Sequence, residues 1–221
     1  MLSFRTGIAS AIAVLFFFAV SVPARADDLF AAARRDDASA VASLITAGAV
    51  IDGRDDRGRT ALLVATHANA VSAARVLIEA GANVNARDDI EDSPFLYAGA
   101  EGRLEILRLC LAAGADLAST NRYGGTALIP AAHHGHVEVV RELVRTPIDK
   151  DHVNKLGWTA LLEAVVLGDG GAVHTEIVRV LVAAGADMNI PDRGGVTALA
   201  HARARGYDAI ADVLKQAGAR E

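Results

Sequence analysis

The polar and apolar positions of the chain repeat with a period of about 33 residues. A hydroxyl residue followed by small and apolar residues recurs at intervals of 33, 33, 33 and 38: Thr60-Ala-Leu-Leu, Ser93-Pro-Phe-Leu, Thr126-Ala-Leu-Ile, Thr159-Ala-Leu-Leu and Thr197-Ala-Leu-Ala. A second motif keeps step with the first: Ala47-Gly-Ala-Val-Ile-Asp, Ala80-Gly-Ala-Asn-Val-Asn, Ala113-Gly-Ala-Asp-Leu and Ala184-Gly-Ala-Asp-Met-Asn. Two motifs that share one period indicate an internal repeat.

Each repeat predicts two helices followed by a hairpin. The Thr or Ser supplies a side-chain oxygen that can cap a short first helix, and the apolar positions after it follow helical spacing. A second helix follows, as in residues 137–144, and the Asp- and Asn-rich stretch beyond it favours a turn back. Glycines that tolerate a positive φ are expected to end both helices: Gly102, Gly135 and Gly168 the first, and Gly81, Gly114 and Gly185 the second. One repeat cannot bury its apolar faces alone, so the repeats must stack.

These motifs resemble the ankyrin repeat over essentially all of residues 27–221. The resemblance implies an all-α solenoid of helix-turn-helix units whose hairpin tips project from one edge, with a role in protein recognition and no catalysis. The register gives six units, with approximate bounds 27–56, 57–89, 90–122, 123–155, 156–193 and 194–221. The family's Thr-Pro-Leu-His is mostly Thr-Ala-Leu-Leu here, which exchanges a polar cap network for apolar packing. The run from Trp158 to Tyr207 resembles bacterial members of the family in particular.

Residues 1–26 differ from the repeats and predict a secretory signal peptide. Arg5 supplies the positive start, residues 8–22 are apolar, and Ala24-Arg25-Ala26 has the small-x-small pattern of a signal peptidase site. The apolar run is ~15 residues, shorter than the ~20 that span a bilayer. We therefore expect cleavage before Asp27 and a soluble monomer in the periplasm of a Gram-negative bacterium, with no stable membrane insertion. The alternative is an uncleaved leader that retains a structural envelope protein at the membrane.

The charge of the chain argues against a nucleic-acid partner. It has 22 Lys and Arg residues against 27 Asp and Glu residues, and two of the basic residues belong to the leader. Affinity for a phosphate backbone depends on Lys and Arg.

Aromatic residues make up only 5% of the chain, so Ala, Val, Leu and Ile have to fill the interior in thin layers. Phe30 and Phe95 are predicted to be core residues.

No residue pattern predicts an enzyme or a cofactor. Cys110 falls where the repeat has buried apolar residues, so we interpret it as an inert core thiol. Glu101 and Glu163 lie two units apart, beyond the ~9.5 Å upper limit for a glycosidase carboxylate pair. The chain has no Gly-x-Ser-x-Gly nucleophile elbow, and Gly168-Asp-Gly-Gly lacks the spacing of a phosphate-binding loop.

Seven histidines raise the question of a metal site. His136 follows Gly135 at a position where the ankyrin repeat commonly has a structural His. His67 and His133 lie two units apart, ~16 to 20 Å for stacked helices, and cannot share a zinc ion whose ligands lie at ~2 Å. His133 and His134 point ~100° apart on a helix. We expect no metal site, and metal or haem binding by His133 and His134 is the alternative to partner binding. The charged tip at residues 87–92 is interpreted as solvated.

The hairpin tips and the concave face of the first helices form the predicted partner-binding surface. Interface hot spots favour Trp, Tyr and Arg, because rigid rings bury much area at small entropic cost. The predicted site residues lie on consecutive units: Tyr97, Arg122, Tyr123, His133, His134, Asn154, Lys155, Trp158 and Glu163. Two alternatives stay open. Trp158 could pack on the neighbouring tip, and the five-residue insertion 169–173 between the helices of the fifth unit could be tolerated bulk or a protrusion that a partner recognises.

The leader generates the first prediction. Protein exported by a Gram-negative host should begin at Asp27, because Ala24-Arg25-Ala26 fits the peptidase site. Intact-mass spectrometry of the purified protein checks this. A mass that still includes Phe16 to Phe18 would contradict it.

Overall fold

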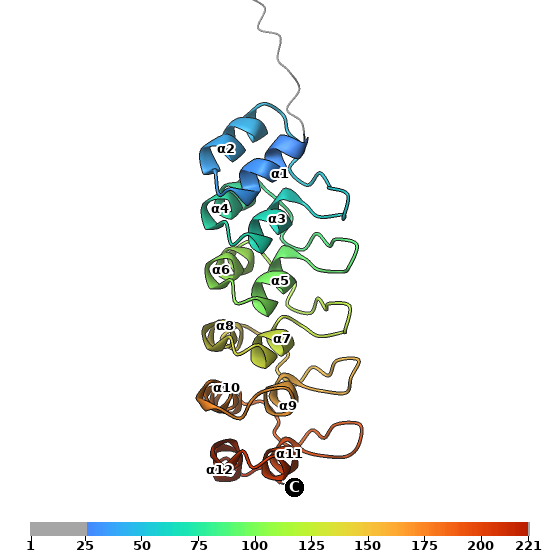
Figure 1. Ribbon diagram of the computed structural model, residues 1–221, viewed down its shortest axis with the longest axis vertical. Coiled ribbons are helices and arrows are strands. Elements are labelled where there is room, and N and C mark those ends of the chain that lie inside the picture. The colour runs from blue at the N-terminus through green and yellow to red at the C-terminus, as the bar shows by residue number, and fades with distance from the viewer. Residues whose placement is uncertain (1–25, 221) are drawn as a thin grey trace, which may run out of the picture.

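Twelve helices stacked in pairs make up the part of the chain that the computed structural model describes, residues 26–220. The first helices of the pairs form one row and the second helices form another, with the hairpin tips projecting beyond the first-helix row (Figure 1). The helices are α1 (Ala26–Arg34), α2 (Ala38–Thr46), α3 (Ala61–His67), α4 (Val71–Glu79), α5 (Pro94–Ala100), α6 (Leu104–Ala112), α7 (Leu128–His133), α8 (Val137–Leu143), α9 (Ala160–Val166), α10 (Ala172–Ala183), α11 (Ala198–Ala204) and α12 (Asp208–Gln216). Each pair packs on the next along the stack. The predicted all-α solenoid is confirmed.

The predicted leader, residues 1–26, lies outside the described residues except for Ala26, where α1 begins. Every helix between residues 26 and 220 is too short or too polar to cross a bilayer.

Small aliphatic side chains fill the core, as the composition predicts. Leu62, Leu107 and Leu143 are each fully buried between neighbouring layers, and Phe95 is fully buried as well. Burial raises the pKa of Cys110 to about 12. Its thiol is therefore protonated at neutral pH, and the interpretation of Cys110 as a core residue is confirmed.

The predicted hydroxyl caps begin four of the first helices. The hydroxyls of Thr60, Ser93 and Thr159 each accept a hydrogen bond at 3.2 Å from the backbone N–H three residues later. Thr197 does the same at 3.3 Å. Each cap satisfies one of the N–H groups that a helix start otherwise leaves without a partner.

The predicted cap at Thr126 is wrong, and Pro130 explains why. In other units the residue four positions after the hydroxyl donates its N–H to the backbone carbonyl of the hydroxyl residue, as Glu163 does to Thr159 at 2.9 Å. Proline has no N–H to donate. The N–H of Ile129 bonds the Thr126 carbonyl instead, at 3.2 Å. The buried Thr126 hydroxyl is left without a hydrogen-bond partner, and α7 begins only at Leu128.

Most of the predicted glycine caps hold, with an exception at the insertion. Gly102 and Gly135 end α5 and α7 at positive φ, as expected. In the fifth unit α9 ends at Val166 without a positive φ at Gly168, and the positive φ, 71°, is found at Gly170, two residues before α10 begins. The last two residues of the predicted insertion 169–173 belong to a helix, because α10 already begins at Ala172. The Asp169 carboxylate accepts from Gly171 N at 2.8 Å and contacts the His174 ring at 2.8 Å. His174 in turn contacts the carbonyl of His133 at 2.9 Å, so the insertion is anchored to the preceding unit.

The second helix of the fourth unit ends without the usual glycine. Gly81, Gly114 and Gly185 end the second helices at positive φ, as predicted. In the fourth unit Thr146-Pro147-Ile148 replaces Ala-Gly-Ala. The Thr146 hydroxyl donates to the Leu143 carbonyl at 2.6 Å and satisfies the helix end in a different way.

Side-chain oxygens of Asp and Asn also join the hairpins of successive units. Asp52 accepts from Asn83 N at 3.0 Å and Asn85 from Asp116 N at 2.9 Å. Asp151 accepts from Asp187 N and Asn189 from Arg220 N, both at 2.8 Å. The register places Ala118 at the equivalent position of the third unit, and alanine has no oxygen to supply. The link between the third and fourth units is therefore missing.

Restoring this link should stabilise the protein. Ala118→Asn places an acceptor near the N–H of Asp149 and should raise the free energy of unfolding by about 0.5 to 1.5 kcal/mol. Asn85→Ala removes an existing link and should lower it by a similar amount. Urea unfolding followed by circular dichroism measures both changes. No gain in Ala118→Asn, with a clear loss in Asn85→Ala, would mean that the fourth unit is not in register for this contact.

Candidate functional site

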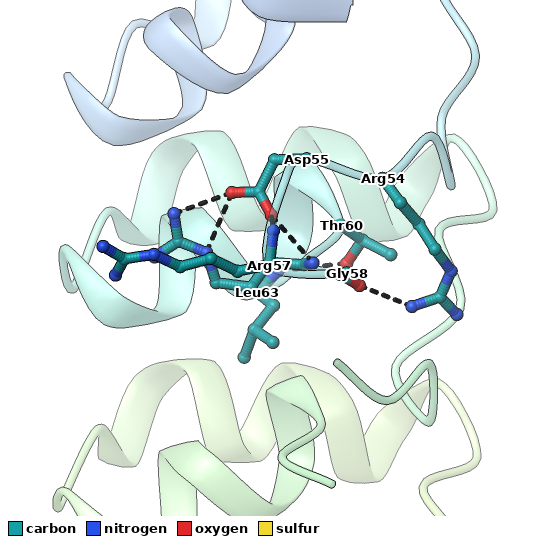
Figure 2. Close-up of polar contacts among 7 residues, drawn as sticks. Arg54, Asp55, Arg57, Gly58, Thr60 and Leu63 are labelled. Atoms are coloured by element: carbon teal, nitrogen blue, oxygen red, sulfur yellow. Dashed lines mark hydrogen bonds and ion pairs between the residues drawn. The ribbon is translucent and has the colours of Figure 1, made fainter. Parts of the chain in front are cut away.

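The same Asp or Asn turn builds five successive hairpin tips. One side-chain oxygen accepts the N–H groups two and four residues later at Asp55, Asp88, Asn121, Asn154 and Asp192. Figure 2 shows this turn at Asp55, next to the Thr60 cap on Leu63. The turn fixes the Asx side chain. The second polar atom of that side chain is therefore also fixed, and in three tips it holds another side chain.

These three tips differ in the side chain that is held. Asp55 binds the guanidinium of Arg59 at 2.7 Å. Asp192 contacts the ring of His201 at 2.8 Å. Asn154 donates from Nδ2 to Oε1 of Glu163 on α9, at 2.7 Å. The shared tip geometry thus positions a cation, an imidazole or a carboxylate at the first-helix face, according to the unit.

A pocket of about 430 Å³ lies on this face across the third, fourth and fifth units. Seven of the nine predicted site residues line it: Tyr97, Arg122, Tyr123, His133, His134, Asn154 and Glu163. Pro130 also lines it, at the register position that carries Tyr97 in the preceding unit and Glu163 in the next. The short proline side chain leaves space between these two longer ones. Sequence reasoning missed Pro130, although its place between two long side chains in the 33-residue register was a usable signal.

Glu163 is the buried charged group of the pocket, with 6% of the residue exposed. Its Oε1 atom accepts from Asn154, and its Oε2 atom lies 3.8 Å from Nδ1 of His133, beyond hydrogen-bonding distance. Burial raises the pKa of Glu163, and the Asn154 hydrogen bond opposes that shift. Burial also lowers the pKa of His133, and the neighbouring His134 acts in the same direction. His133 is therefore a poor counter-charge for Glu163.

Arg122 and Tyr123 form one edge of the pocket. Tyr123 is 55% exposed, and the guanidinium of Arg122 lies 4.9 Å from the centre of its ring. Arg122 also contacts the Asp92 carboxylate at 3.4 Å. Desolvation by burial raises the pKa of Asp92, against the lowering effect of Arg122. The arginine is thus held by an acid on one side and a ring on the other.

Tyr97, which also lines the pocket, stacks on His67 of the preceding unit. The ring centres are 3.8 Å apart and the planes differ by 18°. Burial lowers the pKa of His67, whose Nε2 atom is buried without a hydrogen-bond partner. This contact fixes the Tyr97 ring at the pocket wall.

His134 and His136 pack against the preceding unit and contact each other. His134 Nδ1 lies 2.6 Å from the Ala100 carbonyl, and its ring centre is 4.6 Å from that of His133. His136 precedes α8, and a side chain at Gly102 would come within 2.6 Å of its ring. His136 thus packs closely against the preceding unit, in keeping with a structural role. Residues 26–220 contain no group of three His, Cys, Asp or Glu side chains that could hold a metal ion.

The two predicted residues outside the pocket connect neighbouring elements. Lys155 donates from Nζ to the Arg122 carbonyl at 2.9 Å and so joins two tips. The Trp158 ring is half-buried against the core, which agrees with the packing alternative for this residue. The backbone N–H of Trp158 donates to Oδ1 of Asn154 at 3.1 Å, and the role of Trp158 in partner binding stays a prediction.

Comparisons with known proteins agree with this architecture. The sequence matches the family described as "Ankyrin repeats (3 copies)" over residues 26–88 and 95–192. A crystal structure of an ankyrin repeat domain from Acinetobacter baumannii AYE is 56% identical, with a TM-score of 0.84 and coverage of 87% of this chain and 98% of that one. The ankyrin repeat domain of Bcl-3, a member of the IkappaB protein family, is 28% identical, with a TM-score of 0.79 and coverage of 87% and 86%.

A curated relative matches over a shorter stretch. The "Putative ankyrin repeat protein YahD" of Escherichia coli (strain K12) is 46% identical over 57 residues. The match covers 26% of this chain and spans 28% of the length of that relative.

The half-buried His67, which stacks on the pocket residue Tyr97, generates a prediction on pH. The folded protein holds the pKa of His67 below its usual value, so the unfolded chain binds this proton more readily. The free energy of unfolding should therefore fall as the pH drops below ~6.5. In His67→Gln the fall between about pH 7.5 and pH 5.5 should be smaller. Urea unfolding across this range measures it, with the exposed Arg75→Gln as control. Equal pH dependence in both variants would contradict the assignment of this loss of stability to the protonation of His67.

Proposed function

This chain belongs to the ankyrin-repeat family, and on that premise we propose that it is a non-catalytic binding module that acts in the periplasm and holds a partner protein through its hairpin tips and first-helix face. Ankyrin repeats generally mediate protein–protein interaction. The observation that carries the proposal is the convergence of Tyr97, Arg122, Tyr123 and Glu163 on one pocket that spans three units. Exposed tyrosine beside arginine is typical of interface hot spots.

The opposite face supports this choice of surface. Arg108 on α6 contacts Glu142 on α8 at 3.0 Å, and Arg141 on α8 contacts Glu176 on α10. These ion pairs join the second helices of successive units, so their charges are engaged within the stack. The first-helix face instead carries a pocket and an exposed ring.

The proposed non-catalytic role and periplasmic location rest on separate observations. The buried Cys110 thiol, with a pKa of about 12, supplies no nucleophile at neutral pH. The leader sequence favours export, and the excess of 27 acidic over 22 basic residues disfavours nucleic acid as a partner. The proposed partner is a periplasmic or envelope protein, bound by a monomer.

Truncation of the exposed ring tests the proposal. Tyr123→Ala should weaken partner binding by at least about tenfold while leaving the melting temperature nearly unchanged. The control is Val50→Ala, which truncates a side chain that is 71% exposed at the first tip, away from the pocket. The measurement is in-cell crosslinking in the periplasm of the native host, with captured protein quantified by mass spectrometry against the parent.

If capture of the partner is lost in Tyr123→Ala and kept in Val50→Ala, the result supports the first-helix face as the binding surface. Capture that survives in Tyr123→Ala and is lost in Val50→Ala would move the binding surface to the first unit. Equal capture in all three proteins would argue against this surface altogether.

A further inference from the structure

Glu163 is held in place with half of its carboxylate unused by the fold. The amide oxygen of Asn154 accepts the N–H groups of Leu156 and Trp158 at 2.9 and 3.1 Å, which fixes the direction of its amide group. That amide group donates to Oε1 of Glu163 at 2.7 Å. Oε2 remains on the side of the pocket, 3.8 Å from His133. The carboxylate is therefore oriented before any ligand arrives.

The cations around the pocket are already engaged elsewhere. Arg122 contacts Asp92 and lies over Tyr123, and the Lys155 ammonium donates to the Arg122 carbonyl. His133 is held toward its neutral form by burial. Glu101, which also lines the pocket, is exposed and has no ion pair within residues 26–220. The pocket thus presents two carboxylates, at Glu101 and Glu163, without a matching Lys or Arg.

The stack itself does not require a carboxylate at position 163. The same register position carries Val64, Tyr97, Pro130 and His201 in other units, and those units form the same helix pairs. A buried charge without a close counter-ion is costly. A group that costs stability and that the fold does not need is expected at a functional site.

The walls of the pocket suit a cation that carries an apolar stem. Tyr97 and Tyr123 supply two aromatic rings, and such rings attract guanidinium and ammonium groups. The guanidinium of Arg122 lies 4.9 Å from the Tyr123 ring centre and engages one face of that ring, so a cation of the partner would use the other face. Leu156 and Ile129 add apolar surface along which the stem of a long side chain can lie.

We infer that this pocket receives a lysine or arginine side chain of the partner protein, with Glu163 as its principal ligand and Glu101 at the entrance. The inference rests on the proposed function and adds the chemistry by which the partner is recognised. An acidic side chain would have to displace Asp92 from Arg122 and would meet both carboxylates. A partner segment with an exposed basic residue is therefore the occupant that the charges favour.

A pair of small probes tests the inference without the natural partner. N-acetyl-arginine amide carries the guanidinium, and N-acetyl-citrulline amide is a neutral molecule of nearly the same shape. Titration of the isotope-labelled protein, followed by amide NMR signals of Gly125 and Leu156 at low salt, should show at least about tenfold tighter binding of the arginine probe. Equal binding of the two probes, or no binding of either, would overturn the inference.

Two glutamate variants locate the binding charge. Glu163→Gln keeps an acceptor for Asn154 and removes the charge, so it should bind the arginine probe at least about tenfold more weakly. Its melting temperature should be unchanged or higher, because the buried charge is gone. Glu105→Gln changes an exposed carboxylate that pairs with Arg108 on the second-helix face, and it should bind as the parent does. A Glu163→Gln protein that binds normally, or that melts well below the parent, would make Glu163 a structural residue.

The outcomes separate this inference from the proposed function. If the arginine probe binds no better than the citrulline probe while Tyr123→Ala still loses the partner, the inference of a basic side chain is wrong and the proposed binding surface stands. If the arginine probe binds while Tyr123→Ala retains the partner, the pocket takes a small cationic ligand and the partner-side-chain inference falls. The comparison of the two probes on the parent protein keeps the test decisive even if Glu163→Gln does not fold.

Discussion

Burial of apolar helix faces between adjacent units is the constraint on which the rest of this structure depends. Each pair of helices is too thin to enclose a core, so residues such as Leu62, Leu107 and Leu143 are buried only because another layer covers them. Stacking requires every unit to present the same faces at the same spacing. The 33-residue register follows from this requirement, and it leaves the hairpin tips and the outer side of the first helices free to vary.

The register made the architecture predictable, and its local exceptions made some details unpredictable. The hydroxyl caps at Thr60 and Thr159 follow from residue type and spacing, because the cap is a contact within one helical turn. The cap at Thr126 failed because Pro130 removes the N–H on which the helix start depends, a consequence that the motif alone does not contain. The conformation of residues 168–171 was not predictable, because His174 contacts both Asp169 and the preceding unit, and the motif does not specify these contacts.

The candidate site, too, was predictable from the register only in part. Positions 97, 123 and 163 could be assigned to one face from the register, and the structure brings them to one pocket. The pocket itself could not be predicted, because it needs the short side chain of Pro130 between two long ones and the fixed amide of Asn154 beside Glu163. The sequence left exposure and packing of Trp158 both open, and its ring is half-buried against the core. The departures from the repeat gather in and next to the fourth unit, at Ala118, Pro130 and Pro147, where the pocket lies.

The central claim is that regular units supply stability while the fourth unit gives up part of it to form the site. Native-state hydrogen exchange measures this directly, because it reports an opening free energy for each helix. The account predicts that amides of α7 and α8 open at a free energy about 1 kcal/mol or more below those of α5 and α6, since the hydroxyl cap and an inter-unit link are missing there. Equal protection across the third and fourth units, or greater protection of α7 and α8, would contradict it.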